Sequence, residues 1–153
     1  MTPSSERIFL DACVLFAGSH SPAGASGCIM DLGVDGDFEV AVSRIVIEEA
    51  LRALRSKSGA RAVARFFEFV ANPRIRIGEA PSPAEIDRFS RVLPPKDRHV
   101  LASAVAIGSD FLVTLDRAHF FTPTIVEAKL PLKIVAPGDL LGAWRNRQEE
   151  RSE

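Results

Sequence analysis

Four acidic residues lie where predicted strands end or where the following helices begin. Asp11 stands at the end of the first predicted strand, and Asp116 stands at the end of the strand predicted at 111–116. Asp97 opens the helix that leads into that strand, and Glu49 lies in the first turns of the helix after the second strand. Open α/β sheets bind ligands at the carboxyl ends of their strands, near the point where the strand order reverses. The four acids could therefore converge on one edge of a sheet.

A group of four carboxylates is expected to bind a divalent cation. Singly, each acid has an ordinary explanation: Asp97 as a favourable residue at a helix start, Asp11 as a strand end, Glu49 as solvated surface. Together, four carboxylates repel one another and must be neutralised, which a divalent cation does directly. Oxygen ligands without a nitrogen or sulfur partner are the set that Mg²⁺ and Mn²⁺ prefer, so the sequence predicts one of these ions.

The histidines and cysteines show no arrangement that would change this prediction. His20, His99 and His119 share no metal-ligand or triad spacing. We expect His99 to be structural, whereas His119 could reach a substrate. Cys13 and Cys28 lie in apolar segments, and we expect both to be reduced, buried thiols.

Positive charge lies close to the acids in the sequence. Arg98 and Arg117 each directly follow one of the proposed acids. Arginines on a predicted helix are usually a solvated face, but beside an acidic metal site they could bind phosphates. Thr114 could hydrogen-bond a ligand, a water or a substrate phosphate, or be an ordinary strand residue. Five further cations fall within 14 residues of two consecutive predicted helices: Arg52, Arg55, Lys57, Arg61 and Arg65.

Composition limits the class of protein. The chain has 153 residues, 46% hydrophobic and 25% charged, which suits a single globular domain. Its net charge of −1 gives no global field that would indicate a nucleic-acid partner, although arginine outnumbers lysine by 15 to 4. No apolar run approaches the roughly 18 residues of a membrane span, and residues 1–7 are polar. We therefore expect a cytoplasmic protein without a membrane segment.

Strand and helix signals alternate along the chain, which indicates an α/β domain. Apolar or alternating runs predict strands at 7–16 (with Asp11 at its end), 38–43, 74–78, 111–116 and 132–136. Periodicity and cap residues predict helices at 44–56 after Ser43, at 60–72, from Ser82, from Asp97 to Gly108, and from 138 into a charged tail. The expected architecture is a three-layer α/β/α sandwich with a mainly parallel sheet. We expect one domain at 1–142, followed by the helix end and tail at 143–153.

Several segments resemble those of the PIN domain family, the RNase H-like nuclease fold of VapC-type toxins and flap-type nucleases. The matching segments, within 7–141, are FLDACVLF, VSRIVIEEALRAL, DRHVLASAVAIGSDFLVTLDRAHF and IVAPGDLL. The third segment is the most specific, because an acid opens a helix, a glycine closes it, and a strand runs into Thr-x-Asp. Glu48 competes with Glu49, but the family's spacing of six residues after Ser43 selects Glu49. The resemblance thus places the family's acidic set on Asp11, Glu49, Asp97 and Asp116.

Two neighbouring positions carry separate expectations. Cys13 stands where many family members have Asn or Ser, which removes a polar group from beside Asp11. Asp110 could be an additional acid, but as a turn residue before a strand it is expected to be structural.

The resemblance implies a Mg²⁺- or Mn²⁺-dependent endoribonuclease that hydrolyses RNA with one or two ions, as the toxin of a toxin–antitoxin pair. An antitoxin would then occlude the acidic pocket with a basic side chain. A homodimer is implied too, with 66–70 as a candidate surface that core packing explains better. DNA cleavage stays open, and a catalytically silent PIN-like module that binds RNA or protein is the alternative. A receiver-like phosphoacceptor is disfavoured, because Lys133 begins the last strand rather than following it.

Overall fold

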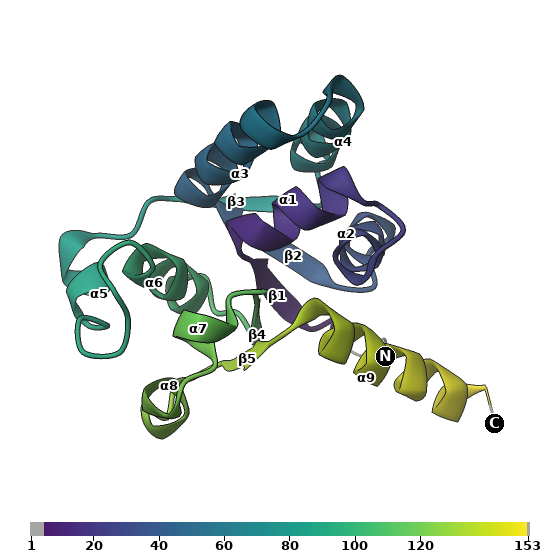
Figure 1. The fold of residues 1–153 in the computed structure, drawn as a ribbon. Coiled ribbons are helices and arrows are strands. Elements are labelled where there is room, and N and C mark those ends of the chain that lie inside the picture. The colour runs from purple at the N-terminus through teal and green to yellow at the C-terminus, as the bar shows by residue number, and fades with distance from the viewer. Residues whose placement is uncertain (1–4, 153) are drawn as a thin grey trace.

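A five-stranded parallel sheet forms the centre of the computed structural model, which describes residues 5–152 (Figure 1). Its strand order is β3-β2-β1-β4-β5, and every neighbouring pair is parallel. The strands are β1 (Arg7–Leu10), β2 (Glu39–Ser43), β3 (Arg76–Gly78), β4 (Phe111–Val113) and β5 (Lys133–Val135).

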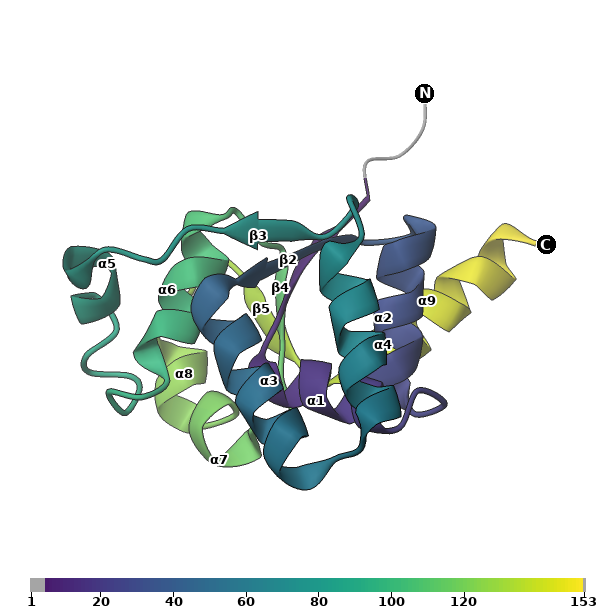
Figure 2. The same cartoon turned by 90° about the horizontal axis from the view of Figure 1, so that it is seen from above.

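Helices cover both faces of this sheet. The chain moves from β1 outward to β2 and β3, and then returns across the sheet to β4 and β5. Because crossovers between parallel strands are right-handed, helices of the outward path and helices of the return path lie on opposite faces. Figures 1 and 2 show these two groups, and the predicted three-layer α/β/α architecture is confirmed. The outward helices are α1 (Ala12–His20), α2 (Ala25–Asp35), α3 (Arg44–Lys57) and α4 (Ala60–Ala71). The return helices are α5 (Pro83–Asp87), α6 (Arg98–Ala106), α7 (Arg117–Phe120) and α8 (Pro123–Glu127), and α9 (Pro137–Arg151) packs beside α2.

The central strands are apolar on both faces because helices bury both faces. In β1, Ile8, Phe9 and Leu10 are at most 1% exposed. Phe9 lies opposite Ala41 of β2 and Leu112 of β4, which are also fully buried. The hydrophobic core therefore runs through the strands whose carboxyl ends carry Asp11 and Asp116.

Three predicted helix boundaries are confirmed by their hydrogen bonds and dihedral angles. The Ser43 hydroxyl accepts a hydrogen bond from the Val46 N–H at 3.2 Å at the start of α3. Ser82 and Glu85 form a reciprocal capping box at the start of α5. Gly108 adopts a φ of +73° just after α6, a left-handed conformation that glycine accepts without strain.

The structure corrects several predicted strand and helix bounds. The first predicted strand, which ends with Asp11 inside the apolar run 7–16, is confirmed as β1, but the apolar residues after Asp11 form the helix α1, which was not predicted. A short, uniformly apolar run has no periodicity that would separate a strand from a helix. The strand predicted at 111–116 ends at Val113, and the short helices α7 and α8 after it were not predicted.

The last helix continues without a break across the domain boundary expected at 142–143. Leu140 and Leu141 of α9 are buried, and Trp144 packs against the hydrophobic core. Arg147, further along the helix, forms an ion pair with Glu6. Within residues 5–152, none of the helices is both long enough and apolar enough to cross a membrane.

Candidate metal centre

The reversal in strand order lies between β1 and β4, and two of the predicted acids lie at this point. Asp11 directly follows β1, and its backbone N–H donates to the Val113 carbonyl of β4 at 3.0 Å. Asp116 follows β4 after only two residues. The geometry of the sheet therefore brings these two acids to the same carboxyl edge, as predicted from the sequence.

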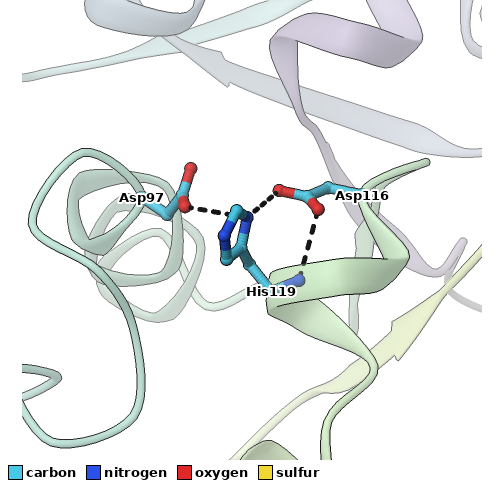
Figure 3. A group of neighbouring side chains, drawn as sticks. All are labelled: Asp97, Asp116 and His119. Atoms are coloured by element: carbon cyan, nitrogen blue, oxygen red, sulfur yellow. Dashed lines mark hydrogen bonds and ion pairs between the residues drawn. The ribbon is translucent and has the colours of Figure 1, made fainter.

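A compact cluster at this edge consists of Asp97, Asp116 and His119 (Figure 3). One potential ligand atom from each of the three residues lies within 4.8 Å of the other two. The His119 Nδ1 atom is 2.9 Å from Asp116 Oδ2 and 3.4 Å from Asp97 Oδ2. Asp97 comes from the start of α6, whereas Asp116 and His119 come from the start of α7, so the cluster joins two elements.

The first turn of α7 explains how His119 reaches the acids. Asp116 is the N-cap of this helix, and its Oδ1 atom accepts a hydrogen bond from the His119 backbone N–H at 3.2 Å. This turn places the imidazole ring over the other carboxylate oxygen, to which Nδ1 donates.

Asp97 has a carboxylate oxygen without a hydrogen bond. Asp97 is the N-cap of α6, but its side chain makes no cap hydrogen bond to the helix. Its Oδ2 atom is buried and has no hydrogen-bond partner among the described residues. The His119 Nδ1 atom, 3.4 Å away, does not supply this partner, because it carries at most one hydrogen and lies closer to Asp116. A buried, unpaired carboxylate oxygen is costly, and a bound cation would remove that cost.

Asp11 lies in a different environment, although it belongs to the same edge. Its side chain is buried, at 8% exposure, and both carboxylate oxygens accept hydrogen bonds from the chain. Oδ1 accepts from the Ala12 N–H and Oδ2 accepts from the Thr114 hydroxyl, each at 2.8 Å. Burial raises the pKa of Asp11 above the ordinary value of an aspartate, and the nearby Asp97 charge raises it further.

Cys13 lies beside Asp11, at the position where the sequence predicted the loss of a polar side chain. Its sulfur is 3.6 Å from Asp11 Oδ2 and 3.5 Å from the Thr114 hydroxyl, and it accepts from the Leu115 N–H at 3.4 Å. Burial, followed by the Asp11 charge, raises the pKa of the Cys13 thiol to about 11. A neutral thiol therefore stands beside Asp11 and donates weakly to it. Both cysteines are free thiols, as predicted, but each is partly exposed and not fully buried.

Glu49 is held by a histidine of another helix. Its Oε1 atom accepts a hydrogen bond from His99 Nε2 at 3.0 Å, which connects α3 to α6. The His99 side chain is only 11% exposed, and its Nδ1 atom has no partner among the described residues. His99 lies two residues beyond Asp97, so this contact ties Glu49 to the helix that begins with Asp97. Glu48 is exposed instead.

Comparison with known proteins agrees with this fold. A family model described as the PIN domain matches residues 7–118, well over half of the chain. The chain belongs to the PIN domain family. The resemblance seen in the sequence is thereby confirmed. A search of the curated proteins found no match.

Solved structures with the same PIN fold come from distant relatives. PAE2754 from Pyrobaculum aerophilum is 20% identical, with a TM-score of 0.61 over 92% of this chain and 97% of that one. VapC20 from Mycobacterium tuberculosis, described as a toxin that cleaves the sarcin–ricin loop, is 15% identical, with a TM-score of 0.57 over 80% and 95% of the two chains. FitAcB from Neisseria gonorrhoeae is 16% identical, with a TM-score of 0.57 over 85% and 97%. At these identities the likeness shows the fold.

The predicted substrate-binding residues of this PIN domain have different surroundings. Thr114 is fully buried, and its hydroxyl is occupied by Asp11 and by the Asp116 N–H, so it does not face a substrate. Arg98 donates from Nε to the Leu93 carbonyl and from Nη2 to the Ser90 carbonyl, which holds the preceding loop. The prediction of substrate contacts by Thr114 and Arg98 therefore gives way to structural roles for both.

The other arginines remain possible phosphate contacts, with one exception. Arg65 donates from Nε to the Ser19 carbonyl at 2.8 Å and so connects α4 to α1. Arg52, Arg55 and Arg61 are exposed on α3 and α4. Arg117 is exposed at the start of α7, with its guanidinium 5.5 Å from the ring centre of Phe121.

The sequence interpretation gave His119 a contact with substrate and His99 a structural role, but it assigned neither histidine to the metal cluster or to a contact with its acids. His119 lies three residues after Asp116, a spacing that places two side chains on the same side of a helical turn. That signal was available, but α7 itself was not predicted. The pairing of His99 with Glu49 crosses 50 residues of sequence and has no local signal. Asp110, by contrast, accepts from the Arg7 N–H at 2.8 Å at the opposite end of the strands, which agrees with its predicted structural role.

Proposed function

We propose that this PIN domain is a divalent-metal-dependent endoribonuclease that acts as the toxin of a toxin–antitoxin pair. The observation that carries the proposal is the buried Asp97 Oδ2 atom, which has no hydrogen-bond donor and lies beside Asp116 at the carboxyl edge of the sheet. A fold without a ligand at this edge has no reason to keep a carboxylate oxygen in that state.

The residues present fit a divalent cation. Asp97 and Asp116 supply oxygens that one ion could share, and His119 Nδ1 adds a nitrogen within the same 4.8 Å. The nitrogen departs from the all-oxygen set expected from the sequence and suits Mn²⁺ better than Mg²⁺. Asp11 and Glu49 complete the proposed acidic set. When bound, the cation would lower the pKa of a water and polarise a phosphodiester.

The chain's own residues would orient that chemistry. The Thr114 hydroxyl fixes one oxygen of Asp11, and His99 fixes one oxygen of Glu49, so neither carboxylate rotates freely. The His119 Nδ1 atom, which donates to Asp116 in this structure, would give up that hydrogen to bind an ion. His119 lies at the exposed side of the cluster, at 33% side-chain exposure. It is therefore available to contact the phosphate or leaving oxygen of a substrate. RNA, rather than DNA, is proposed because the fold resembles that of the ribonuclease toxin VapC20.

An antitoxin partner is proposed from other structural neighbours. VapBC2 from Rickettsia felis, which is 13% identical, was crystallised with a fragment of its promoter DNA, and a FitAB structure also contains a DNA fragment. By analogy, a basic side chain of such a partner would occupy the open side of the acidic cluster. The silent-module alternative is disfavoured, since it would leave the buried Asp97 oxygen without a purpose.

Cleavage of single-stranded RNA tests the proposal directly. We expect the purified chain to cleave RNA with Mg²⁺ or Mn²⁺ and to stop in EDTA. Asp116→Asn should lower the rate by at least about 100-fold, because removing one charged metal ligand costs several kcal/mol of barrier stabilisation. Asp31→Asn, an exposed acid of α2, is the matched control and should cleave normally. A wild-type chain that binds no Mn²⁺ and leaves RNA intact would establish the silent module instead.

A further inference from the structure

An open pocket of about 480 Å³ lies directly beside the acidic cluster. This volume falls within the range of about 300–1,000 Å³ that small-molecule sites occupy. Leu115 and Arg117, the residues on either side of Asp116, line the pocket. So does Phe16, on the helix that begins after Asp11. The pocket is therefore formed by the same two chain segments that carry Asp11 and Asp116.

Two stacked aromatic rings form part of the pocket's lining. Phe16 and His20 lie four residues apart on α1, with ring centres 5.6 Å apart and ring planes within 9° of parallel. The His20 Nδ1 atom is 2.8 Å from the Ser58 hydroxyl, so the imidazole ring is fixed in orientation. Leu115 adds an apolar surface, with 46% of its area exposed to solvent. A flat apolar ligand would find a fixed stacking surface here.

The charges around the pocket indicate which part of a nucleotide it fits. Asp139, in the first turn of α9, is exposed and lines the pocket, so it would repel a phosphate but could accept a hydrogen bond from an amino group. Arg117 also lines the pocket and makes no ion pair among the described residues, and its contact with the Phe121 ring leaves its N–H groups for the phosphate of the same nucleotide. The stacked rings would thus contact the face of a base and Asp139 its amino group, while Arg117 would contact the phosphate of that nucleotide.

We propose that this pocket binds one nucleobase of the single-stranded RNA substrate, that of a nucleotide next to the scissile phosphate. The base stacks on the Phe16–His20 pair, and Arg117 contacts its phosphate. The proposal rests on the ribonuclease function proposed above and adds to it a base-binding site that would set the cleavage position.

Abasic nucleotides provide the decisive test. Binding of a labelled single-stranded RNA of about 12 nucleotides is measured with Ca²⁺ in place of Mn²⁺, with one abasic position moved along the strand. For the wild type, one position should weaken binding by about 5- to 150-fold, the effect expected when one base–aromatic stack is removed. The variant His20→Ala/Leu115→Ser should bind the intact RNA about as weakly and be insensitive to that abasic position.

Two further variants separate stacking from damage to the fold. His20→Phe keeps an aromatic ring without the hydrogen bond to Ser58. Unlike the double variant, it should therefore retain the wild type's sensitivity to the abasic position. Val126→Ser removes an apolar side chain that is 76% exposed and lies outside the pocket, and it should behave as the wild type. Mn²⁺ affinity should be unchanged in all of them, since the acids remain.

The outcomes distinguish the two proposals. If the wild type cleaves RNA but the abasic positions weaken its binding no differently from that of the double variant, the proposal of a base-binding site is wrong. The proposal of a ribonuclease is then unaffected. If the double variant weakens only the binding of the antitoxin protein, the pocket belongs to that partner and the base site is again wrong. If the wild type neither binds nor cleaves RNA, both proposals fail together.

Discussion

The acidic edge has two sides, Asp11 after β1 and the pair Asp97 and Asp116 near β4, and they differ in how many of their carboxylate oxygens accept hydrogen bonds from the chain. On the β1 side, Asp11 is buried and both of its oxygens accept hydrogen bonds from the chain. On the β4 side, Asp97 and Asp116 are partly open and share one histidine nitrogen, and one Asp97 oxygen has no hydrogen bond. The carboxylate on the β1 side therefore has its hydrogen bonds without a ligand, whereas the β4 side still has an oxygen that a ligand could contact.

This difference assigns different tasks to similar residues. Asp11 supplies a fixed negative charge whose burial destabilises the ionised form, as its raised pKa shows. Asp97 and Asp116 supply the coordination capacity that is still open. Thr114 joins the two sides, because its hydroxyl donates to Asp11 and accepts from the Asp116 N–H at 3.1 Å. The following predictions change one side at a time.

The largest of these expected effects tests whether Glu49 binds the same cation as Asp97 and Asp116. Glu49→Gln should reduce Mn²⁺ affinity and cleavage by about 10- to 100-fold, because it removes a charge that His99 orients. The neighbouring Glu48→Gln is the matched control, since Glu48 is exposed, and should have little effect. Calorimetric Mn²⁺ titration and single-turnover cleavage measure both. Equal losses from the two variants would mean that general charge, not the position of Glu49, matters.

Breaking the connection between the two sides should cost stability. Thr114→Val leaves the Asp116 N–H without its partner and the buried Asp11 Oδ2 atom with only the weak Cys13 thiol donor, so we expect a loss of about 1–3 kcal/mol in the free energy of unfolding. Urea denaturation in EDTA measures this loss. Thr114→Ser keeps the hydroxyl and should retain most of the stability. A valine variant as stable as the wild type would show that the two sides are independent.

The raised pKa of Asp11 predicts a pH-dependent gain from Asp11→Asn. The folded protein binds the Asp11 proton more tightly than the unfolded chain, so wild-type stability falls as pH rises from 3.8 through the folded pKa. Asparagine retains an acceptor for the Ala12 N–H but carries no charge. In EDTA, the variant should therefore gain on the wild type as the pH rises through this window.

Thermal unfolding at a series of pH values measures this gain, with Asp31→Asn as the control that shows no such trend. Saturating Mn²⁺ should reverse the order, because the cation stabilises the wild type more. A variant that is less stable than the wild type at neutral pH without metal would indicate that the hydrogen bonds of Asp11 outweigh its desolvation.

The smallest effect concerns charges outside the edge. Arg52→Gln/Arg55→Gln, both exposed on α3, should weaken RNA binding at all sequences alike. The slope of log K against log salt should fall by about 0.7–1 for each phosphate that the variant no longer neutralises. Arg145→Gln/Arg151→Gln on α9 is the matched control. Unchanged slopes would return the α3 arginines to the solvated surface and leave Arg117 to bind the phosphate.

The sequence predicted the fold and the position of the edge because both depend on local signals. Buried strands, the Ser43 cap and Gly108 are all marked by residue type and spacing, and Asp11 and Asp116 follow directly from strand ends. The contacts within the site could not be predicted in the same way. Thr114 reads as an ordinary strand residue, and only the pairing of β1 with β4 brings its hydroxyl to Asp11. His99 meets Glu49 only through helix packing.

Cys13 lies at the centre of this edge, yet its chemistry should be nearly silent. With a pKa of about 11, only about one thiol in ten thousand is ionised at pH 7, and the thiolate is the form that reacts with oxidants and alkylating agents. Oxidants and alkylating agents should therefore modify Cys13 far more slowly than they modify an exposed, acidic thiol. Covalent inhibitors aimed at this cysteine would meet an unreactive target, despite its proximity to Asp11.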